Sequence, residues 1–284
     1  MRFAFHILYD AAMRFVEDDG WAISSYIALT ILTTMFPFLI FVTSLAGFLG
    51  SAGLADEAVR IIFQTWPEQV AQPLAVEVHN VLTQTRGGLL TIGGVLAVYF
   101  SSSGVEALRV GLNRAYDVKE TRPWWLLRLE SILYVLIGAI VLLTLTLLVV
   151  LAPLIWAVAL RLAPHIEKLD RFVTFSRFSI ATLILLLALV IVHKLLPAGR
   201  RTLREIWPGI LLTFALWVAS GAVIGSYLAE FARNYVTTYA GLASVMIALV
   251  FLYWVAAIFI FGGELNTALC AAEKRHNDEA LKGR

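Results

Sequence analysis

Cysteine and charge are both scarce in this 284-residue chain. It has one cysteine, Cys270, and only 15% charged residues, whereas a soluble domain usually has about 25%. A single cysteine excludes an intrachain disulfide and a metal cage built from thiolates. The formal net charge of +2 is too small to predict a nucleic-acid partner.

The sequence also lacks histidine clusters and nucleotide-binding loops. Its histidines are His6, His79, His165, His193 and His276, and no two of them have the spacing of metal ligands. No Gly-rich loop is followed by Lys and then Ser or Thr. We therefore predict no enzyme, no metal and no cofactor, and any transport would draw on an ion gradient or a partner.

What the chain has in abundance is apolar sequence. Hydrophobic residues make up 60% of it and come in blocks long enough to cross a bilayer. We predict an all-α polytopic transmembrane bundle with six spans, at residues 21–49, 88–103, 132–160, 178–196, 206–229 and 242–268. Pro37 and Pro153 give the long first and third spans a place to bend.

The distribution of basic residues predicts the orientation of these spans. With both termini on one side, that side holds fifteen of the Lys and Arg residues and the other side holds seven. An excess of positive charge marks the cytoplasmic side, so we predict that both termini are cytoplasmic. The acidic residues at 17–19 interrupt the N-terminal region too early for a cleavable signal peptide.

Two regions have the apolar spacing of amphipathic helices. Residues 1–20 are predicted to form an interfacial helix whose apolar face comprises Phe5, Leu8, Ala12, Phe15 and Val16. Residues 54–86 are predicted to form an outer amphipathic segment within the membrane domain, which spans 21–270. Residues 271–284 would then be a cytoplasmic tail.

The chain resembles the YihY/BrkB family of bacterial inner-membrane proteins over nearly its whole length. The resemblance depends on the order and spacing of several short motifs. They are Ser25-Tyr26-Ile27-Ala28-Leu29 with Phe36-Pro37, Leu112-Asn113-Arg114-Ala115-Tyr116-Asp117-Val118, Trp207-Pro208-Gly209, Tyr239-Ala240-Gly241-Leu242-Ala243 and Gly262-Gly263-Glu264-Leu265-Asn266. The pair Tyr253-Trp254 departs from the more usual Trp-Leu-Tyr of the family.

The resemblance implies a six-span protein of the inner membrane whose biochemistry is not settled. Members of the family carry labels that include ribonuclease BN, virulence factor and candidate transporter. A metallonuclease needs clustered His and Asp ligands, and the scattered histidines of this chain offer none. We therefore regard ribonuclease activity as the weakest of the three expectations.

Glu264 is the strongest candidate for function. A carboxylate at membrane depth costs about 2.5–3.5 kcal/mol on insertion scales, so it is kept only where it faces protein, water or an opposite charge. Gly262 and Gly263 beside it allow a neighbouring helix to approach closely. Glu264 either lines a cavity as a coupling or substrate-binding group, or pairs near the inner interface with Arg109 or Arg114.

The end of the second predicted span is rich in hydroxyl groups. Ser101, Ser102 and Ser103 precede a glycine, which favours a break in the helix, or the serines bond back to the preceding turn and the helix continues. Glu106 and Arg109 lie three positions apart and could pair with each other. Asn113 and Asn266 could bond to each other and tie the second and sixth spans together.

The first predicted span has a polar stripe. Tyr26, Thr30, Thr33 and Thr34 fall on one helical face and Pro37 follows them. This pattern is typical of a cavity-lining helix or of polar contacts between helices. A separate basic cluster of Arg200, Arg201 and Arg204 is expected to set topology and to contact lipid phosphates.

We expect a transporter or exporter of a small amphipathic solute or lipid, with membrane lipids as its surroundings. The alternative is a membrane scaffold or envelope assembly factor that acts with partner proteins through residues 54–83. Both alternatives leave open a homo-oligomer or an envelope protein partner.

Overall fold

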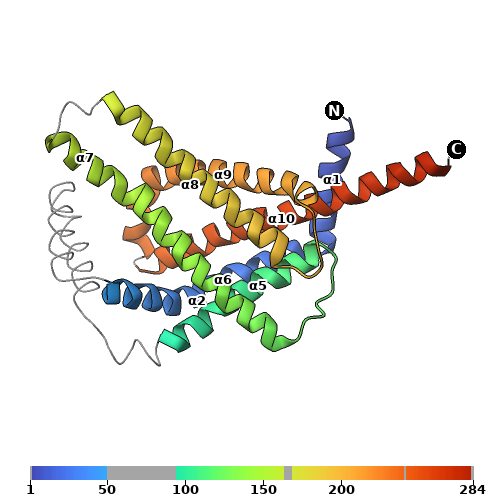
Figure 1. Ribbon diagram of the computed structural model, residues 1–284, viewed down its shortest axis with the longest axis horizontal. Helices are drawn as coiled ribbons and strands as arrows, with labels where there is room; N and C mark the ends of the chain where they lie inside the picture. Colours follow the sequence, from blue (N-terminus) through green and yellow to red (C-terminus); the bar gives the residue numbers. More distant parts are fainter. Residues whose placement is uncertain (1, 50–93, 163–167, 240, 283–284) are drawn as a thin grey trace. The chain divides into compact units, whose positions relative to one another are not determined.

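The computed structural model describes residues 2–49, 94–162, 168–239 and 241–282, and within these ranges every regular element is helical (Figure 1). The helices are α1 (Arg2–Glu17), α2 (Gly20–Leu49), α5 (Gly94–Ala115), α6 (Trp124–Thr146), a π-helix η2 (Leu147–Leu151), α7 (Ala152–Leu162), α8 (Asp170–Leu195), α9 (Leu203–Tyr239) and α10 (Gly241–Lys282). The all-α membrane class predicted from the apolar blocks is confirmed for this part of the chain.

Among the described residues, five helical segments are long and apolar enough to cross a membrane. They are Val95–Ala115, Trp124–Val149, Asp170–Leu195, Leu203–Val223 and Val245–Arg275. The first predicted span falls on α2, of which Gly20–Met35 is a shorter apolar helix. The protein is therefore a multi-pass membrane protein, whereas six spans and cytoplasmic termini stay predictions.

Several predicted boundaries were wrong. The second span was placed at 88–103, but α5 continues to Ala115 because Glu106, Arg109 and Arg114 are tolerated at its polar end. The fourth span was expected to begin at 178, and α8 begins eight residues earlier at Asp170, an acidic residue that suits a helix N-terminus. Helix α10 runs on to Lys282 through the region predicted as a tail.

The described residues divide into two compact units. The first comprises residues 1–33, 103–129 and 186–284, and the second comprises residues 34–102 and 130–185. In the first unit α9 runs alongside α10 (Figure 1), and the indole N–H of Trp217 donates to the carbonyl of Val255 at 3.0 Å. The contacts of Glu264, Asn266, Tyr116 and His193 described below lie within this unit.

Helix α1 packs on α10. Its buried residues are Ile7, Ala11 and Phe15, which recur every four positions. Ile7 and Ala11 meet Leu265 and Ala268 of α10, and the ring of Phe15 contacts that of Phe261. Phe5, Leu8 and Val16 of the predicted stripe are exposed. An exposed apolar face is also what a helix at the membrane interface presents to lipid, so the interfacial helix stays a prediction.

In the second unit a short π-helix, which is wider than an α-helix, lies just before Pro153. The π-helix Leu147–Leu151 comes directly before Ala152–Leu162, which contains Pro153 near its start. Proline has no N–H and its ring crowds the preceding turn, and a π-turn accommodates both effects. The irregularity predicted at Pro153 is therefore present. The indole of Trp156 donates to Asp170 at 2.7 Å.

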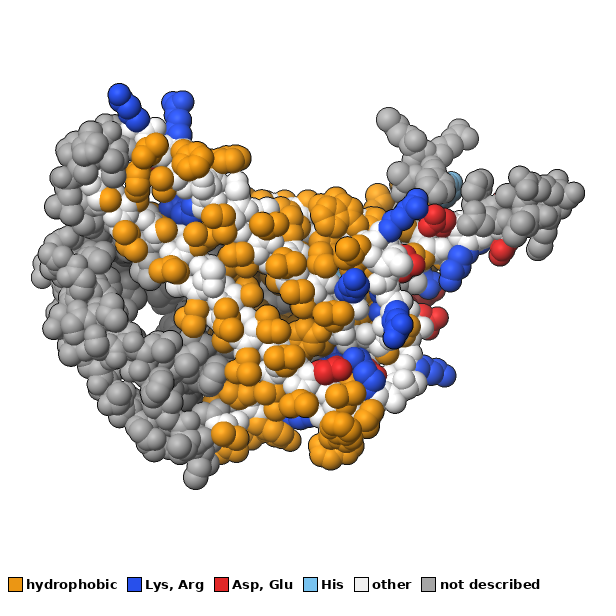
Figure 2. Space-filling view, viewed as in Figure 1, with side chains coloured by type: hydrophobic (Ala, Val, Ile, Leu, Met, Phe, Trp, Pro, Cys, Tyr) orange, Lys and Arg blue, Asp and Glu red, His pale blue; other side chains and the backbone are white. Residues whose placement is uncertain are grey.

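The surface of the molecule is largely apolar. Figure 2 shows hydrophobic side chains covering most of the visible face, while charged side chains gather over the ends of α1 and α10. Many large apolar side chains are exposed, as expected where lipid replaces water as the solvent. The predicted outer segment 54–86 lies outside the described residues.

Candidate functional site

The segment Gly262–Asn266 is the most deeply buried polar stretch of α10. Its glycines allow close contact with two neighbouring helices. A Cβ added at Gly262 would overlap Thr213 and lie 2.9 Å from the carbonyl oxygen of Gly209, both on α9. A Cβ at Gly263 would lie 3.1 Å from the Cβ of Ala115 on α5. The close helix approach expected at these glycines is present.

Glu264 is fully buried, and neither of its carboxylate oxygens has a hydrogen-bond partner among the described residues. Ile260 lies one turn earlier on the same helical face and would contact a side chain built on Gly111 of α5. Since residues four apart share a face, Glu264 points toward the side of α10 that meets α5.

The expected ion pair of Glu264 with Arg109 or Arg114 does not form. Arg114 pairs with Asp18 at 3.3 Å and with Asp19 at 3.7 Å, and Arg109 donates to the carbonyl of Leu127 at 3.0 Å. These two arginines are committed elsewhere because the turn between α1 and α2 and the start of α6 offer nearer acceptors.

The charged groups that act on Glu264 through space oppose one another. They are Asp18, Arg14, Arg114 and Asp117, two anions and two cations. In the part of the chain that the structure describes, no cation forms an ion pair with the carboxylate. A buried carboxylate in this situation is stabilised by whatever neutralises it, which can be a proton or a metal cation.

Asn266 lies on another face of α10 and is the centre of a buried hydrogen-bond network. Its Oδ1 accepts from the backbone N–H of Gly209 at 2.7 Å, and its Nδ2 donates to the hydroxyl of Tyr116 at 3.1 Å. The Tyr116 hydroxyl also lies 2.9 Å from Nδ1 of His193. One set of donors satisfies all three contacts: Tyr116 accepts from Asn266 and donates to His193.

This arrangement fixes the proton of His193. If Nδ1 accepts from Tyr116, the proton of the neutral ring sits on Nε2, for which the described residues provide no partner. Burial raises the pKa of Tyr116 to about 12, so its phenol keeps the proton that it donates. The ring of Tyr116 is also covered by the guanidinium of Arg201, 3.9 Å from the ring centroid.

The end of α5 positions Tyr116. The N–H of Asp117 donates to the carbonyl of Arg114, and the N–H of Val118 donates to the carbonyl of Asn113. Together with the positive φ of 49° at Asp117, these bonds form a Schellman motif. Aspartate tolerates this left-handed conformation better than most residues, which is why the helix stops here and Tyr116 turns toward α10.

Asn113 and Asn266 do not bond to each other, so that prediction was wrong. Asn113 instead accepts from the N–H of Ala198 at 2.7 Å and donates to Glu120 at 3.1 Å. Arg122 holds the same carboxylate through two nitrogens and lowers the pKa of Glu120 to about 2. The α5 and α10 helices are tied together by Tyr116 and by Thr267, whose hydroxyl donates to the carbonyl of Ala115 at 2.8 Å.

The serine-rich stretch does not break its helix. Helix α5 is continuous through Ser101, Ser102 and Ser103, and the hydroxyl of Ser102 donates back to the carbonyl of Tyr99 at 2.6 Å. The alternative of a continuing helix is therefore the correct one, because a back-bonded serine satisfies its own hydroxyl. Glu106 pairs with Arg128 of α6 at 2.7 Å and not with Arg109.

The polar stripe of the first predicted span lies on α2. Tyr26 and Thr33 are exposed, and Thr30, Thr34 and Pro37 are partly buried. The Thr33 hydroxyl is satisfied within its own helix, by the carbonyls of Leu29 and Thr30 at 3.0 Å each. The lining of a cavity by these residues stays a prediction.

Tyr116 and His193 are the residues that the sequence analysis missed. His193 was treated only as one of several scattered histidines, although it is fully buried between Tyr116 and Phe259. Tyr116 lies 150 positions from Asn266 and 77 from His193. Two asparagines at apolar helix ends were the available signal, because a buried amide needs a partner.

Comparison with known proteins places the chain in a family. The model of the family described as Virulence factor BrkB matches residues 11–283. A ribonuclease-like protein of Bacillus subtilis (strain 168), YfkH, is 28% identical over 269 residues, which cover 94% of this chain and 95% of the relative. No solved structure matches.

Proposed function

The chain belongs to the virulence factor BrkB family of membrane proteins, and on this premise we propose that it is a transporter or exporter of a small amphipathic solute or lipid. It acts in the inner membrane, with six spans and both termini in the cytoplasm. The family description names no reaction. Nuclease chemistry is not proposed, since the described residues contain no group of three or more His, Cys, Asp or Glu that could hold a metal.

One observation carries the proposal: Glu264 is fully buried on a membrane-crossing helix and both its oxygens lack a partner in the described part of the chain. A purely structural carboxylate would have gained an arginine or a set of N–H donors, as Glu120 has. A carboxylate kept without them is suited to bind and release a proton, a cation or a cationic head group.

The proposal also uses the close helix packing around Glu264. Small residues let α5, α9 and α10 approach closely at Gly209, Gly262 and Gly263, so Glu264 is held between closely packed helices. Loading of Glu264 would change the charge between α10 and α5. Solute movement along α2, α5 and α10 would follow from that change.

Native mass spectrometry of the purified protein tests this proposal. The wild type, Glu264→Gln and Glu273→Gln are extracted with their surrounding lipid, and the co-purifying molecules are identified. Glu273 is the matched control because it is an exposed carboxylate on the same helix. A specific solute or lipid retained by the wild type and Glu273→Gln, and lost from Glu264→Gln, supports the proposal.

Two further results have clear meanings. If all three proteins are folded and retain the same molecules in the same amounts, Glu264 has no role in binding and the proposal fails. That result would favour a membrane scaffold, for which truncation of residues 54–83 is the next experiment. Folding of each variant is checked by size-exclusion chromatography and thermal unfolding in the same detergent.

A further inference from the structure

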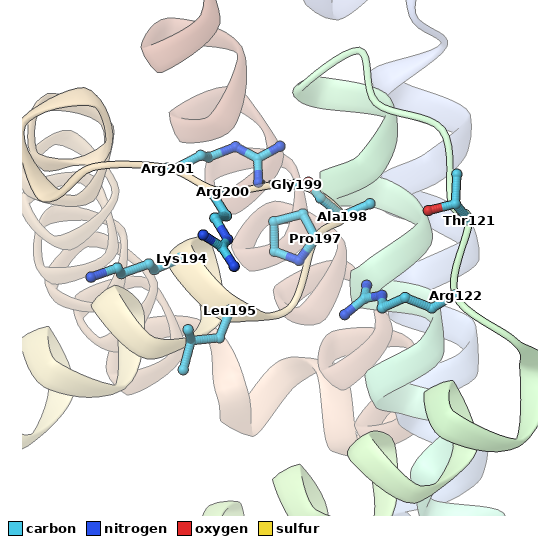
Figure 3. Close-up of a pocket in the computed structure, with 9 residues that line it drawn as sticks. All are labelled: Thr121, Arg122, Lys194, Leu195, Pro197, Ala198, Gly199, Arg200 and Arg201. Carbon is cyan, nitrogen blue, oxygen red and sulfur yellow. Dashed lines mark hydrogen bonds between the residues drawn. The ribbon is translucent and has the colours of Figure 1, made fainter.

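A basic pocket of about 320 Å³ lies beside the polar network, at the end of the bundle where α5 and α8 end and α6 and α9 begin. It is lined by Thr121, Arg122, Lys194, Leu195, Pro197, Ala198, Gly199, Arg200 and Arg201 (Figure 3). Four of these side chains are cationic and none is acidic. The volume is at the lower end of the roughly 300–1,000 Å³ typical of small-molecule pockets.

Two of the four cations are available to a ligand. For Lys194 and Arg200, the structure gives no ion pair or hydrogen bond with any described residue. Figure 3 shows the guanidinium groups of Arg200 and Arg122 on either side of Pro197. Surface lysines and arginines usually find a carboxylate partner when one is near, and here the pocket wall offers none.

The other two cations are held in place and cover main-chain oxygens. Arg122 is fixed by two bonds to Glu120, at 2.7 and 2.8 Å, and donates to the carbonyl of Leu196 at 3.0 Å. Arg201 donates to the carbonyl of Ala198 at 3.0 Å. The carbonyl groups after α8 would otherwise repel an anion, so these two arginines remove the negative end of the helix from the pocket.

The position of the pocket indicates the depth at which it works. Membrane-crossing segments end at Ala115 and Leu195 and begin at Trp124 and Leu203, on either side of the pocket residues. Trp124, Trp125 and Trp207, close in sequence to these ends, are exposed by 79%, 57% and 46%. Exposed tryptophans at span ends mark the membrane–water interface, which is where lipid phosphates lie.

We propose that this pocket binds a phosphate group, and that its ligand in the membrane is the headgroup of an anionic phospholipid. Lys194 and Arg200 contact the phosphate oxygens, while Arg122 and Arg201 form the fixed wall behind it. Arginine and lysine at close range are the side chains that recognise phosphate best. The phosphate group is the feature shared with soluble organophosphates, so both sources are tested.

The pocket is also linked to the buried network. Arg201 lines the pocket with one face and covers the ring of Tyr116 with the other, and Tyr116 bonds to Asn266 of α10. A bound phosphate would attract the guanidinium of Arg201 and weaken its contact with the ring of Tyr116. Because Tyr116 is bonded to Asn266, the change would reach α10. The inference does not rest on the transport proposal, because neither Glu264 nor its neighbours line the pocket.

The test compares two double variants that remove the same charge. Lys194→Gln with Arg200→Gln changes the pocket, and Lys119→Gln with Arg204→Gln changes exposed residues at the same end that do not line it. Native mass spectrometry of the full chain in detergent, titrated with phosphatidylglycerol and with phosphatidylcholine, measures lipid binding. Calorimetric titration with inorganic phosphate is the second arm.

The wild type is expected to prefer phosphatidylglycerol. The pocket variant should bind it about tenfold more weakly or worse, since each basic residue near an anionic headgroup contributes about fivefold and two are removed. The control variant should stay within about twofold of the wild type. Binding of inorganic phosphate without phosphatidylglycerol would keep the phosphate site and assign it to a soluble ligand.

Two results would overturn the inference. One is that the wild type binds neither phosphatidylglycerol in preference to phosphatidylcholine nor inorganic phosphate. The other is that both double variants lose the same amount of binding, which would make the interaction a property of the whole charged surface. Neither result depends on whether Glu264→Gln retains its co-purifying molecule, so the two proposals fail separately.

Discussion

The hydrogen bond between Asn266 and Tyr116 gives the sharpest prediction from this structure. Asn266 is 1% exposed and bonds to Gly209 and Tyr116. The change Asn266→Ala removes both bonds, and Tyr116→Phe removes the bonds to Asn266 and His193 while keeping the ring under Arg201. Only the bond between Asn266 and Tyr116 is lost in both single variants.

The magnitudes follow from the burial of these groups. A hydrogen bond contributes about 0.5–1.5 kcal/mol net, and a buried donor left without an acceptor costs about 1–3 kcal/mol. Asn266→Ala removes two such bonds, so we expect about 1–3 kcal/mol of lost stability. Tyr116→Phe should cost about 1–3 kcal/mol. The double variant should cost about 1 kcal/mol less than the sum, because the shared bond is counted twice in that sum.

The assay is reversible unfolding of the purified protein in mixed micelles with increasing sodium dodecyl sulfate. The control cycle pairs Asn266→Ala with Trp217→Phe. Trp217 on α9 bonds to Val255 on α10. Val255 lies eleven residues before Asn266, which is about 16 Å along an α-helix. The control pair should be additive within about 0.5 kcal/mol. If the Asn266 and Tyr116 pair is equally additive, the bond contributes nothing and the network does not hold α5 to α10.

Two further predictions concern stability. Gly262→Ala should cost about 1–3 kcal/mol in the same assay, because the added Cβ would press on the backbone of Gly209. The control is Gly221→Ala on α9, where a Cβ has open space and the change should be neutral or slightly stabilising. Equal effects of the two changes would contradict the close contact at Gly262. The pKa of Glu120 is lowered from 4.5 to about 2, so the stability from its pair with Arg122 is fully present above pH 4.5 and is lost as the pH falls toward 2. Glu120→Gln should lower the thermal unfolding temperature at pH 7 and make that temperature less dependent on pH between about 2 and 4.5. If the variant and the wild type have the same pH profile, the ion pair of Glu120 with Arg122 does not contribute to stability.

Local composition was enough to identify the pieces of the candidate site but not their contacts. Glu264, Gly262 and Asn266 stood out because polar and very small residues are unusual in an apolar helix. The partners of these residues come from α5, α8 and α9, far away in the chain. Nothing in the local sequence around Tyr116 or His193 shows which buried amide they meet.

Helix α1 shows the same limit in packing. A 3.6-residue period predicted an amphipathic helix, and Arg2–Glu17 is one. Which face of α1 is covered depends on where α10 lies: Ile7 and Ala11 pack on Leu265 and Ala268, while Phe5, Leu8 and Val16 are exposed. The predicted ion pair of Glu106 was wrong for the same reason. Glu106 pairs with Arg128 of α6 and not with Arg109 of its own helix.

The sequence by itself determined that this is a polytopic helical membrane protein, because the length and apolarity of a span are local properties that the bilayer enforces on any chain. It also identified Glu264 as a carboxylate within an apolar helix, where burial is costly. Only the tertiary structure decided that Glu264 has no hydrogen-bond partner among the described residues, that Tyr116 joins Asn266 to His193, and that four cations line one pocket. These facts depend on distances between segments that lie far apart in the chain, and such distances are set by packing, which the order of residues does not display.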